Sequence, residues 1–315
     1  ILIYVKGKGI VLNEPSVVSI DVNSKKVLAV GKEAKEMVGR TPGKVKAIKP
    51  MKDGVIADFD TTEEMINQFM KKAVGRRLLT KPRILICCPS NITGVEKNAI
   101  REIAERMGAR RVFLEEEPKV AAVGAGIDIS KPSGSMIIDI GGGTTDIAVL
   151  SLGGIVASDS IRVAGNRFDE DIISFIKNKY KVIIGEKTAE DIKISIGTVL
   201  KSHKKSSLEV TGRSSITGLP ETITVISEDV QEALKEDIKK IIEAVKSVLE
   251  KTPPELAADI SDKGIILTGG GSLINGIMEK LRKELKVPVF ISDNPLTNVV
   301  EGTGILLDNL HLIDN

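Results

Sequence analysis

The chain is poor in the residues on which several classes of protein depend. Among its 315 residues there is no tryptophan, and aromatic side chains make up only 3%. Stacking of unpaired bases needs aromatic side chains. A surface that attracts nucleic acid also needs an excess of positive charge, whereas the net charge is only +2. We therefore expect no nucleic-acid partner.

Cysteine and histidine are equally scarce. Cys87 and Cys88 are adjacent in a strand-like stretch, where their side chains point to opposite faces and a bond between them would be strained. We interpret both as small core residues of a protein in a reducing cytosol. His203 and His311 have no metal-ligand residues near them in the sequence, so we treat both as structural or surface residues.

Long apolar runs are also missing. No run approaches the ~20 residues that a transmembrane helix needs, and no signal peptide is visible, so we expect no segment to cross a membrane. With 42% hydrophobic residues the chain can still bury a core, and its length favours two domains or one doubled domain. A mixed α/β pattern opens the chain and restarts near residue 132. In the first part, Thr61 and Glu64 have the spacing of a capping box at the start of a helix.

A glycine-rich stretch, DIGGGTTD at 139–146, follows the apolar run SMIID. The residues after it alternate at period two and predict a strand. This excludes a Walker A loop and a Rossmann turn, because both open a helix. In a strand–turn–strand, backbone N–H groups at Gly141, Gly142 and Gly143 can converge on one anion, and the Thr144 hydroxyl adds a donor. A plain glycine hairpin is the alternative.

A second glycine triplet follows the apolar strand GIILT. Gly269, Gly270 and Gly271 lead into the helix LINGIMEKLRKEL, so N–H groups at the helix start are available to a ligand. The missing side chains let a flat base or sugar lie against the backbone. Asp139, at the end of the first apolar strand, would hold a metal ion through its water shell, as Mg²⁺ prefers. Two such turns suggest one nucleotide held between them.

These motifs carry a resemblance to known proteins. The segments DIGGGTTD, LTGGGS and EEPKVAA together resemble the actin, chaperone and sugar kinase ATPase superfamily. Three longer segments, GKGIVLNEPSVVSID, KPMKDGVIADF and EKTPPELAADISDKGIILTGGGSL, resemble MreB, the bacterial actins, and the resemblance extends along essentially the whole chain. It implies an actin-like α/β fold, with two ribonuclease-H-like domains and small inserted subdomains around a cleft for Mg·ATP. It also implies that the chain polymerises with itself into filaments.

The resemblance also implies how the chain is divided. We expect a domain I and a domain II, with a small subdomain in each, at 1–131 plus 301–315 (subdomain about 20–51) and at 132–300 (subdomain about 168–229). The family's first phosphate loop, a short Asp-Leu-Gly-Thr type of turn, would come just before Ile1. Because a protein of this kind without that loop would bind ATP poorly, we expect the loop to precede this stretch of sequence.

The family's site residues can be matched one by one. The resemblance assigns Asp139 to the metal-water aspartate, the first glycine triplet with Thr144 to the second phosphate loop, and the second triplet to the adenosine loop. Glu190 and Lys193 match residues near the ribose and adenine, and a helical spacing of three places both on one face. An ordinary solvated pair is the alternative.

Glu117 is the third of three consecutive glutamates and precedes Pro118, which opens a helix of small residues. Such a run is usually a solvated loop, but the resemblance matches Glu117 with the family's catalytic glutamate. Its role is to orient a water in line with the γ-phosphate, aided by the Thr144 hydroxyl. Phosphoryl transfer needs mainly positioning and charge stabilisation. We therefore expect hydrolysis of ATP to ADP and phosphate.

The segment KKAVGRRLLTKPR, at 71–83, contains basic residues and no acidic ones around Leu78 and Leu79. Paired leucines on a basic loop can enter a bilayer interface while lysine and arginine meet anionic head groups. A solvated loop whose leucines cover the core is the alternative. MreB proteins bind membranes through such a loop, so the resemblance implies a cytoplasmic protein at the inner face of the cell membrane, with membrane-anchored cell-shape proteins as partners.

The leading hypothesis is therefore a filament-forming ATPase of the bacterial cytoskeleton that controls cell shape. A small-molecule kinase on the same fold would need a sugar pocket with a catalytic aspartate, and a chaperone-type nucleotide domain would need a peptide-binding segment; the sequence shows neither signature. A nucleotide-gated scaffold with negligible hydrolysis stays open as an alternative, although Glu117 and Thr144 argue against it.

Overall fold

The structure, a computed structural model, describes residues 1–52, 54–75, 81–200 and 206–309. The chain forms two compact units, Ile1–Gly126 with Thr297–Asn315, and Ile127–Leu296. The junctions between the units lie a few residues before those predicted from the sequence. No helix among the described residues is long and apolar enough to cross a membrane.

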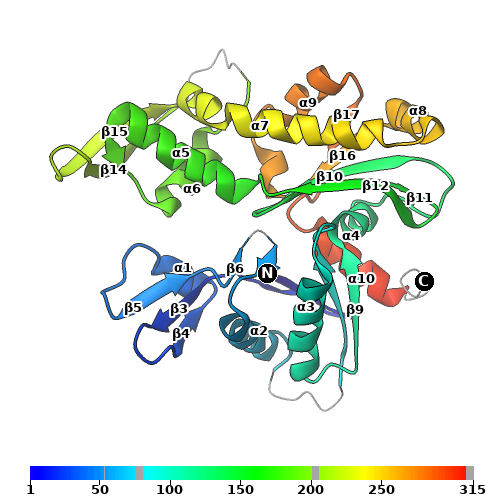
Figure 1. The fold of residues 1–315 in the computed structure, drawn as a ribbon, viewed down its shortest axis with the longest axis horizontal. Helices are drawn as coiled ribbons and strands as arrows, with labels where there is room; N and C mark the ends of the chain where they lie inside the picture. Colours follow the sequence, from blue (N-terminus) through cyan, green and yellow to red (C-terminus); the bar gives the residue numbers. More distant parts are fainter. Residues whose placement is uncertain (53, 76–80, 201–205, 310–315) are drawn as a thin grey trace. The chain divides into compact units, whose positions relative to one another are not determined.

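The first unit combines short sheets with five helices among its described residues. Its strands are β1 (Leu2–Val5), β2 (Gly9–Asn13), β3 (Val18–Asp21), β4 (Val27–Val30), β5 (Val45–Ile48), β6 (Met51–Lys52), β7 (Val55–Ile56), β8 (Arg83–Cys88) and β9 (Arg111–Glu116). Its helices are α1 (Lys32–Glu36), α2 (Phe59–Val74), α3 (Gly94–Arg106), α4 (Glu117–Gly124) and α10 (Asn298–Asp308). Strand β3 lies between β4 and β5 (Figure 1), and β8 pairs in parallel with β9.

Helices α4 and α10 approach closely because each has a glycine at the contact. A Cβ atom on Gly124 would lie 1.8 Å from the carbonyl oxygen of Asn298, and one on Gly302 would lie 2.0 Å from that of Val120. Only a residue without a side chain fits at either position, since protein interiors leave no space for such an overlap. This contact fixes α4, at whose first residue Glu117 lies.

The predicted capping box at the start of α2 is wrong. The helix begins at Phe59, and the cap is Asp58, whose carboxylate accepts hydrogen bonds from Thr61 N at 3.1 Å and Thr61 Oγ1 at 2.8 Å. Glu64 instead accepts a bond from Gln68 at 2.9 Å. The Asp58 carboxylate accepts both bonds and places negative charge at the helix N-terminus, so Asp58 is a better cap than Thr61.

Of the two cysteines of the first unit, Cys88 is a buried core residue, as predicted, and Cys87 is half-buried. The Cys88 thiol is buried and donates to the carbonyl oxygen of Glu115 at 3.5 Å, and the Cys87 sulfur lies 3.3 Å from Thr303 Oγ1. Both thiols are free, and burial raises the pKa of each, that of Cys88 to about 12. Both therefore stay protonated at neutral pH and have little nucleophilic reactivity. His203 and His311 lie outside the described residues.

The second unit is built on one mixed sheet with the strand order β12-β11-β10-β16-β17. Its strands are β10 (Ser135–Ile140), β11 (Thr145–Ser151), β12 (Gly154–Ile161), β13 (Val182–Ile183), β14 (Ser207–Ser214), β15 (Pro220–Ile226), β16 (Ile265–Thr268) and β17 (Val289–Ile291). Its helices are α5 (Gly165–Tyr180), α6 (Glu186–Ile196), α7 (Ser227–Glu250), α8 (Pro254–Lys263), the 3₁₀ helix η1 (Gly270–Leu273) and α9 (Ile277–Leu285). Strand β10 pairs antiparallel with β11 and in parallel with β16.

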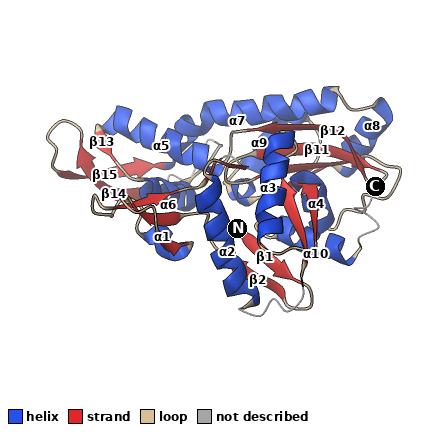
Figure 2. Ribbon diagram, turned by 60° about the horizontal axis from the view of Figure 1, so that its bottom comes forward, coloured by secondary structure: helices blue, strands red, loops and turns tan. Residues whose placement is uncertain are grey.

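Helix α7 covers this sheet. It lies along β11 and β12, as both views show (Figures 1 and 2), while β14 and β15 form a small sheet with β13 at the other end of the unit. Its buried side chains recur every three or four positions and include Leu234, Ile238, Ile241 and Val245. Each contributes about 1.5–3 kcal/mol by leaving water. This core fixes the ends of strands β10 and β16, which the two glycine triplets follow.

Candidate functional site

The first glycine triplet forms the turn between β10 and β11, as the sequence predicts. The last strand pair is Ile140 with Thr145, and Gly141 N then donates to the carbonyl oxygen of Thr144 at 2.9 Å. Gly142, at the tip, is exposed, whereas Thr144 is 7% exposed. The turn is thus closed by its own backbone and leaves Gly142 exposed.

The start of α5 supports this turn. Gly165 N donates to the carbonyl oxygen of Gly141 at 3.1 Å, and Asn166 N donates to that of Gly142 at 2.7 Å. Neither Gly165 nor Asn166 was predicted as a site residue from the sequence. The signal available was the stretch AGN between the strand GIVASDSI and the next helix, since a glycine at a helix start permits close approach of another backbone. The turn is therefore held from outside its own hairpin.

Asp139 is a buried carboxylate beside this turn. It is 5% exposed and lies directly across the β10–β11 pair from Asp146, which is 1% exposed. Burial, and then the charge of Asp146, raise the pKa of Asp139 to about 7. Two facing carboxylates are costly in a low-dielectric environment, and a nearby cation offsets that cost.

The donor set fits a hydrated divalent cation. Among the described residues no three histidine, cysteine or acidic side chains gather closely enough to enclose a metal ion. A carboxylate pair with few other protein ligands suits Mg²⁺, which keeps several of its waters. Asp139 is the residue that would hold such an ion at this end of the sheet.

The second glycine triplet packs against the first turn. Gly269 has φ 80°, and its N–H donates to the carbonyl oxygen of Pro295 at 2.9 Å. A Cβ atom there would lie 2.3 Å from both Asp139 Oδ1 and the carbonyl oxygen of Ile140. The two turns, predicted separately from the sequence, therefore meet at the ends of the neighbouring strands β10 and β16.

The helix expected directly after this triplet begins later. Gly270–Leu273 form the 3₁₀ helix η1, and α9 starts only at Ile277. Gly276, with φ 85°, stands between them in a left-handed conformation, which an α-helix cannot include. The expectation of helical N–H groups at the triplet was therefore wrong, because a tight 3₁₀ turn follows it.

We expect Gly269→Ala to destabilise the protein by about 2 kcal/mol or more, because alanine is strained at positive φ and its Cβ would overlap Asp139 and Ile140. Denaturant unfolding measures the loss. Gly218→Ala is the matched control: Gly218 also has positive φ, at 76°, but no atom lies within 4 Å of the added Cβ. Equal losses in the two variants would contradict the close packing of the two turns.

A cavity of about 640 Å³ opens beside the two turns, within the second unit. Six predicted site residues line it: Gly141, Gly142, Glu190, Lys193, Gly270 and Gly271. Asp139, Gly143, Thr144 and Gly269 are not among the lining residues. The cavity wall also includes apolar Leu273 and Leu296 and the hydroxyls of Ser195 and Thr198. A cavity of this size, with apolar walls and a few polar groups, is typical of a small-molecule site.

The remaining predicted residues lie elsewhere. Glu117 is half-buried at the first position of α4, in the first unit. Leu78 and Leu79 fall outside the described residues. On either side of them the described basic residues Lys71 and Arg83 are exposed.

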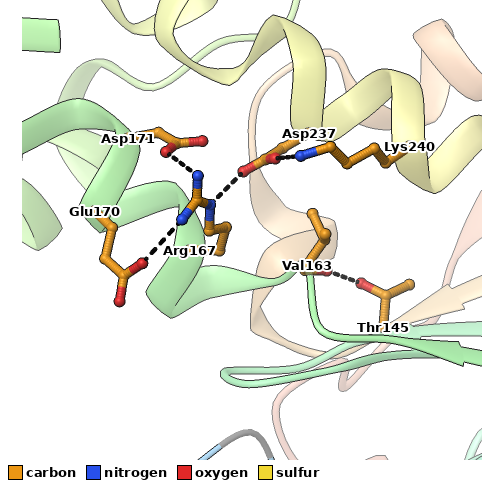
Figure 3. Close-up of polar contacts among 7 residues, drawn as sticks. All are labelled: Thr145, Val163, Arg167, Glu170, Asp171, Asp237 and Lys240. Atoms are coloured by element: carbon orange, nitrogen blue, oxygen red, sulfur yellow. Dashed lines mark hydrogen bonds and ion pairs between the residues drawn. The ribbon is translucent and has the colours of Figure 1, made fainter. Parts of the chain in front are cut away.

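A charged cluster lies around Arg167, which directly follows Asn166 on α5 (Figure 3). Arg167 of α5 contacts Asp171 at 2.9 Å and Glu170 at 3.3 Å, and its Nε lies 3.7 Å from Asp237 on α7. Asp237 has no exposed side-chain surface, and Lys240 contacts its other oxygen at 3.0 Å. The cluster joins α5 to α7 with three carboxylates and two cations.

The same view shows how the chain enters α5. Thr145 Oγ1, at the start of β11, donates to the carbonyl oxygen of Val163 at 2.6 Å (Figure 3). Val163 lies in the segment that joins β12 to α5. This bond anchors that segment next to the glycine turn.

This cluster predicts a pH-dependent stability. Burial raises the pKa of Asp171 to about 6, and the hydrogen bond to Asp237 and the charge of Asp237 add to this effect. The charges of Arg167 and Lys240 act in the opposite direction. A carboxyl group with a raised folded-state pKa contributes stability that is complete below its usual value of 3.8 and is lost as pH rises through about 6.

Asp171→Asn should therefore be more stable than the parent at pH above about 7, by about 1 kcal/mol or roughly 2–4 °C, with little difference near pH 4. Thermal unfolding at both pH values measures this. Glu170→Gln is the control, because Glu170 is 58% exposed on the same arginine; a gain for Asp171→Asn that is equal at both pH values would contradict the titration.

Comparison with solved structures assigns the fold. The structure matches that of MreB5 of Spiroplasma citri bound to ADP with a TM-score of 0.94 and 42% identity, over 98% of this chain and 93% of that chain. The same protein bound to AMPPNP gives the same values. The predicted actin-like α/β fold is confirmed.

Comparison with sequences assigns the family. The family model for the MreB/Mbl protein matches residues 1–315. The cell shape-determining protein Mbl of Bacillus cereus is 63% identical over 310 residues, 98% of this chain and 93% of that protein. The cell shape-determining protein MreB of Escherichia coli K12 is 49% identical over 316 residues, 99% of this chain and 91% of that protein. The chain belongs to the MreB/Mbl family of cell shape-determining cytoskeletal proteins, which confirms the resemblance seen in the sequence.

Proposed function

We propose that this chain binds and hydrolyses ATP and, coupled to that cycle, polymerises into filaments that control cell shape at the inner face of the cell membrane. The observation that carries the proposal is the cavity beside the two glycine turns of the second unit. Its support comes from MreB5 of Spiroplasma citri, which has the same fold at 42% identity and whose structures hold ADP and AMPPNP.

The residues of the chain divide the work as follows. Backbone N–H groups of the turn at Gly142 and Gly143 bind phosphate oxygens, as successive amides in a glycine turn do. Asp139 is the residue that would hold a hydrated Mg²⁺, which would supply charge neutralisation on the phosphates. The resemblance to the family assigns to Glu117 the orientation of the attacking water. Hydrolysis then depends on positioning and charge stabilisation rather than on covalent chemistry.

Sedimentation together with phosphate release tests the function. With Mg·ATP we expect protein in the pellet and phosphate in solution, and with EDTA we expect neither. Filaments without phosphate release would favour the alternative of a nucleotide-gated scaffold. Phosphate release that needs an added small-molecule acceptor would favour a kinase, and the absence of nucleotide binding would overturn the proposal.

Membrane association is the second part of the proposal. The exposed Lys71 and Arg83 on either side of Leu78 and Leu79 suit anionic head groups, at about 1 kcal/mol each. We expect the chain to co-sediment with vesicles that contain anionic lipid and to lose most of that binding on Leu78→Ser with Leu79→Ser. Unchanged binding of the double variant would count against the leucine pair as the membrane contact.

A further inference from the structure

Lys193 of α6 contacts two residues of α5. Its ammonium donates to the carbonyl oxygen of Gly165 at 2.9 Å and forms an ion pair with Asp169 Oδ1 at 2.8 Å. The side chains of Lys193 and Asp169 are each only 14% exposed. A charge held this far from water needs such partners, and bonds from a charged donor are stronger than neutral ones. The lysine is therefore committed to α5.

The peptide that Lys193 holds is the one that supports the first glycine turn. The carbonyl of Gly165 and the N–H of Asn166 belong to the same peptide unit. The carbonyl accepts from Lys193, while the N–H donates to the carbonyl oxygen of Gly142 at 2.7 Å. A positive charge at one end of a peptide polarises it, and this strengthens the bond donated from the other end.

That chain of bonds also sets the direction of the amides in the turn. Gly141 and Gly142 both point their carbonyl oxygens at α5. In a trans peptide the N–H is antiparallel to the carbonyl, so the N–H groups of Gly142 and Gly143 point away from α5. These are the amides available to an anion.

Gly165 lies within van der Waals reach of both Lys193 and the first turn. A Cβ atom on Gly165 would lie 3.4 Å from the carbonyl oxygen of Gly141, 3.6 Å from Lys193 Nζ and 3.7 Å from Gly142 Cα. Three segments that are distant in the sequence therefore converge on one glycine. A substitution at Lys193 is therefore expected to affect the turn through Gly165.

We propose that Lys193 is a positioning residue for the phosphate-binding turn: it acts through the Gly165–Asn166 peptide and fixes the amides of Gly142 and Gly143. This inference deepens the proposed function and rests on it. The resemblance implies a role for Lys193 near the ribose and adenine, whereas this inference predicts that Lys193 affects the binding of the phosphate groups. Glu190, three residues earlier on α6, keeps its place on the cavity wall.

Two ligand fragments separate these roles. Tripolyphosphate carries the phosphates without a base, and adenosine carries the base and ribose without phosphates. We expect Lys193→Met to weaken Mg·ATP and tripolyphosphate by about tenfold or more and to leave adenosine within about twofold, each measured as displacement of a fluorescent ATP analogue. Lys193→Arg should restore binding, since it keeps the charge. Lys187→Met, an exposed lysine on the same helix, is the control and should change nothing. A loss of adenosine affinity equal to or larger than that of tripolyphosphate would overturn the proposal.

Amide hydrogen exchange of the nucleotide-free protein tests the same point without a ligand. Lys193→Met should speed exchange at the amide of Asn166, whose protection depends on its bond to Gly142, and Lys187→Met should not. Unchanged exchange in Lys193→Met would overturn the positioning role. Lys193→Gln, which keeps a donor without the charge, should give an intermediate rate and serves if the methionine variant does not fold. Failure of the parent protein to bind Mg·ATP would instead overturn the proposed function, so the two failures are distinct.

Discussion

Glu117→Ala is expected to lower ATP hydrolysis by about 10²-fold or more while leaving nucleotide binding largely intact. In the proposed function the carboxylate directs a water and the glycine turns bind the nucleotide, so loss of the carboxylate should appear in kcat and not in affinity. Single-turnover phosphate release and equilibrium binding of Mg·ATP measure the two quantities. Filaments should still form with ATP and should persist longer, because the nucleotide is not consumed.

A neighbouring glutamate supplies the control for this variant. Glu116 ends β9, is half-buried, and makes no side-chain bond to the start of α4 although it stands at the cap position. Glu116→Ala should hydrolyse ATP at close to the parent rate. Unchanged phosphate release in Glu117→Ala would sink its assignment, and an equal loss in both variants would show that the effect is structural.

Asp139→Asn is expected to have two opposite effects. In the absence of nucleotide it should stabilise the protein at pH 8 by about 2 kcal/mol, because it removes a buried charge that faces Asp146. In the presence of nucleotide it should abolish most of the Mg²⁺ dependence of ATP affinity and hydrolysis, since a neutral amide is a much weaker partner for a hydrated cation. Denaturant unfolding without ligand and ATP binding with Mg²⁺ or EDTA measure the two effects.

Asp146→Asn separates the two effects of Asp139→Asn. Removing either carboxylate relieves the repulsion between them, so both variants should gain stability. Only the Asp139 variant should lose its response to Mg²⁺. If Asp146→Asn loses that response equally, the ion is held by the pair and not by Asp139; if neither loses it, the metal assignment is wrong.

Local chemistry explains which features could be predicted from the sequence. The strand–turn–strand around Gly141 is visible because the residues after Thr144 alternate at period two, and the placement of the second triplet follows from the apolar strand before it. Periodicity predicted a mixed α/β pattern, whereas the family and the actin-like fold were predicted from the resemblance. The exact helix starts were harder to predict: Asp58 displaced the predicted cap of α2, and Gly276 delayed α9, because one side-chain bond or one backbone angle decides each.

The sequence by itself determined that two glycine turns follow apolar strands, and its resemblance to the family implied that Asp139, Thr144, Glu190 and Lys193 take part in nucleotide binding. Only the tertiary structure decided what those side chains touch. It placed Asp139 opposite Asp146 and against Gly269, and it bound Lys193 to the peptide that supports the turn. Residues 165 and 193 are 28 positions apart, and no local pattern specifies which of many acceptors a lysine will reach. That choice is made when the helices pack on the sheet and bring the Gly165 carbonyl and the Asp169 carboxylate within reach of the lysine.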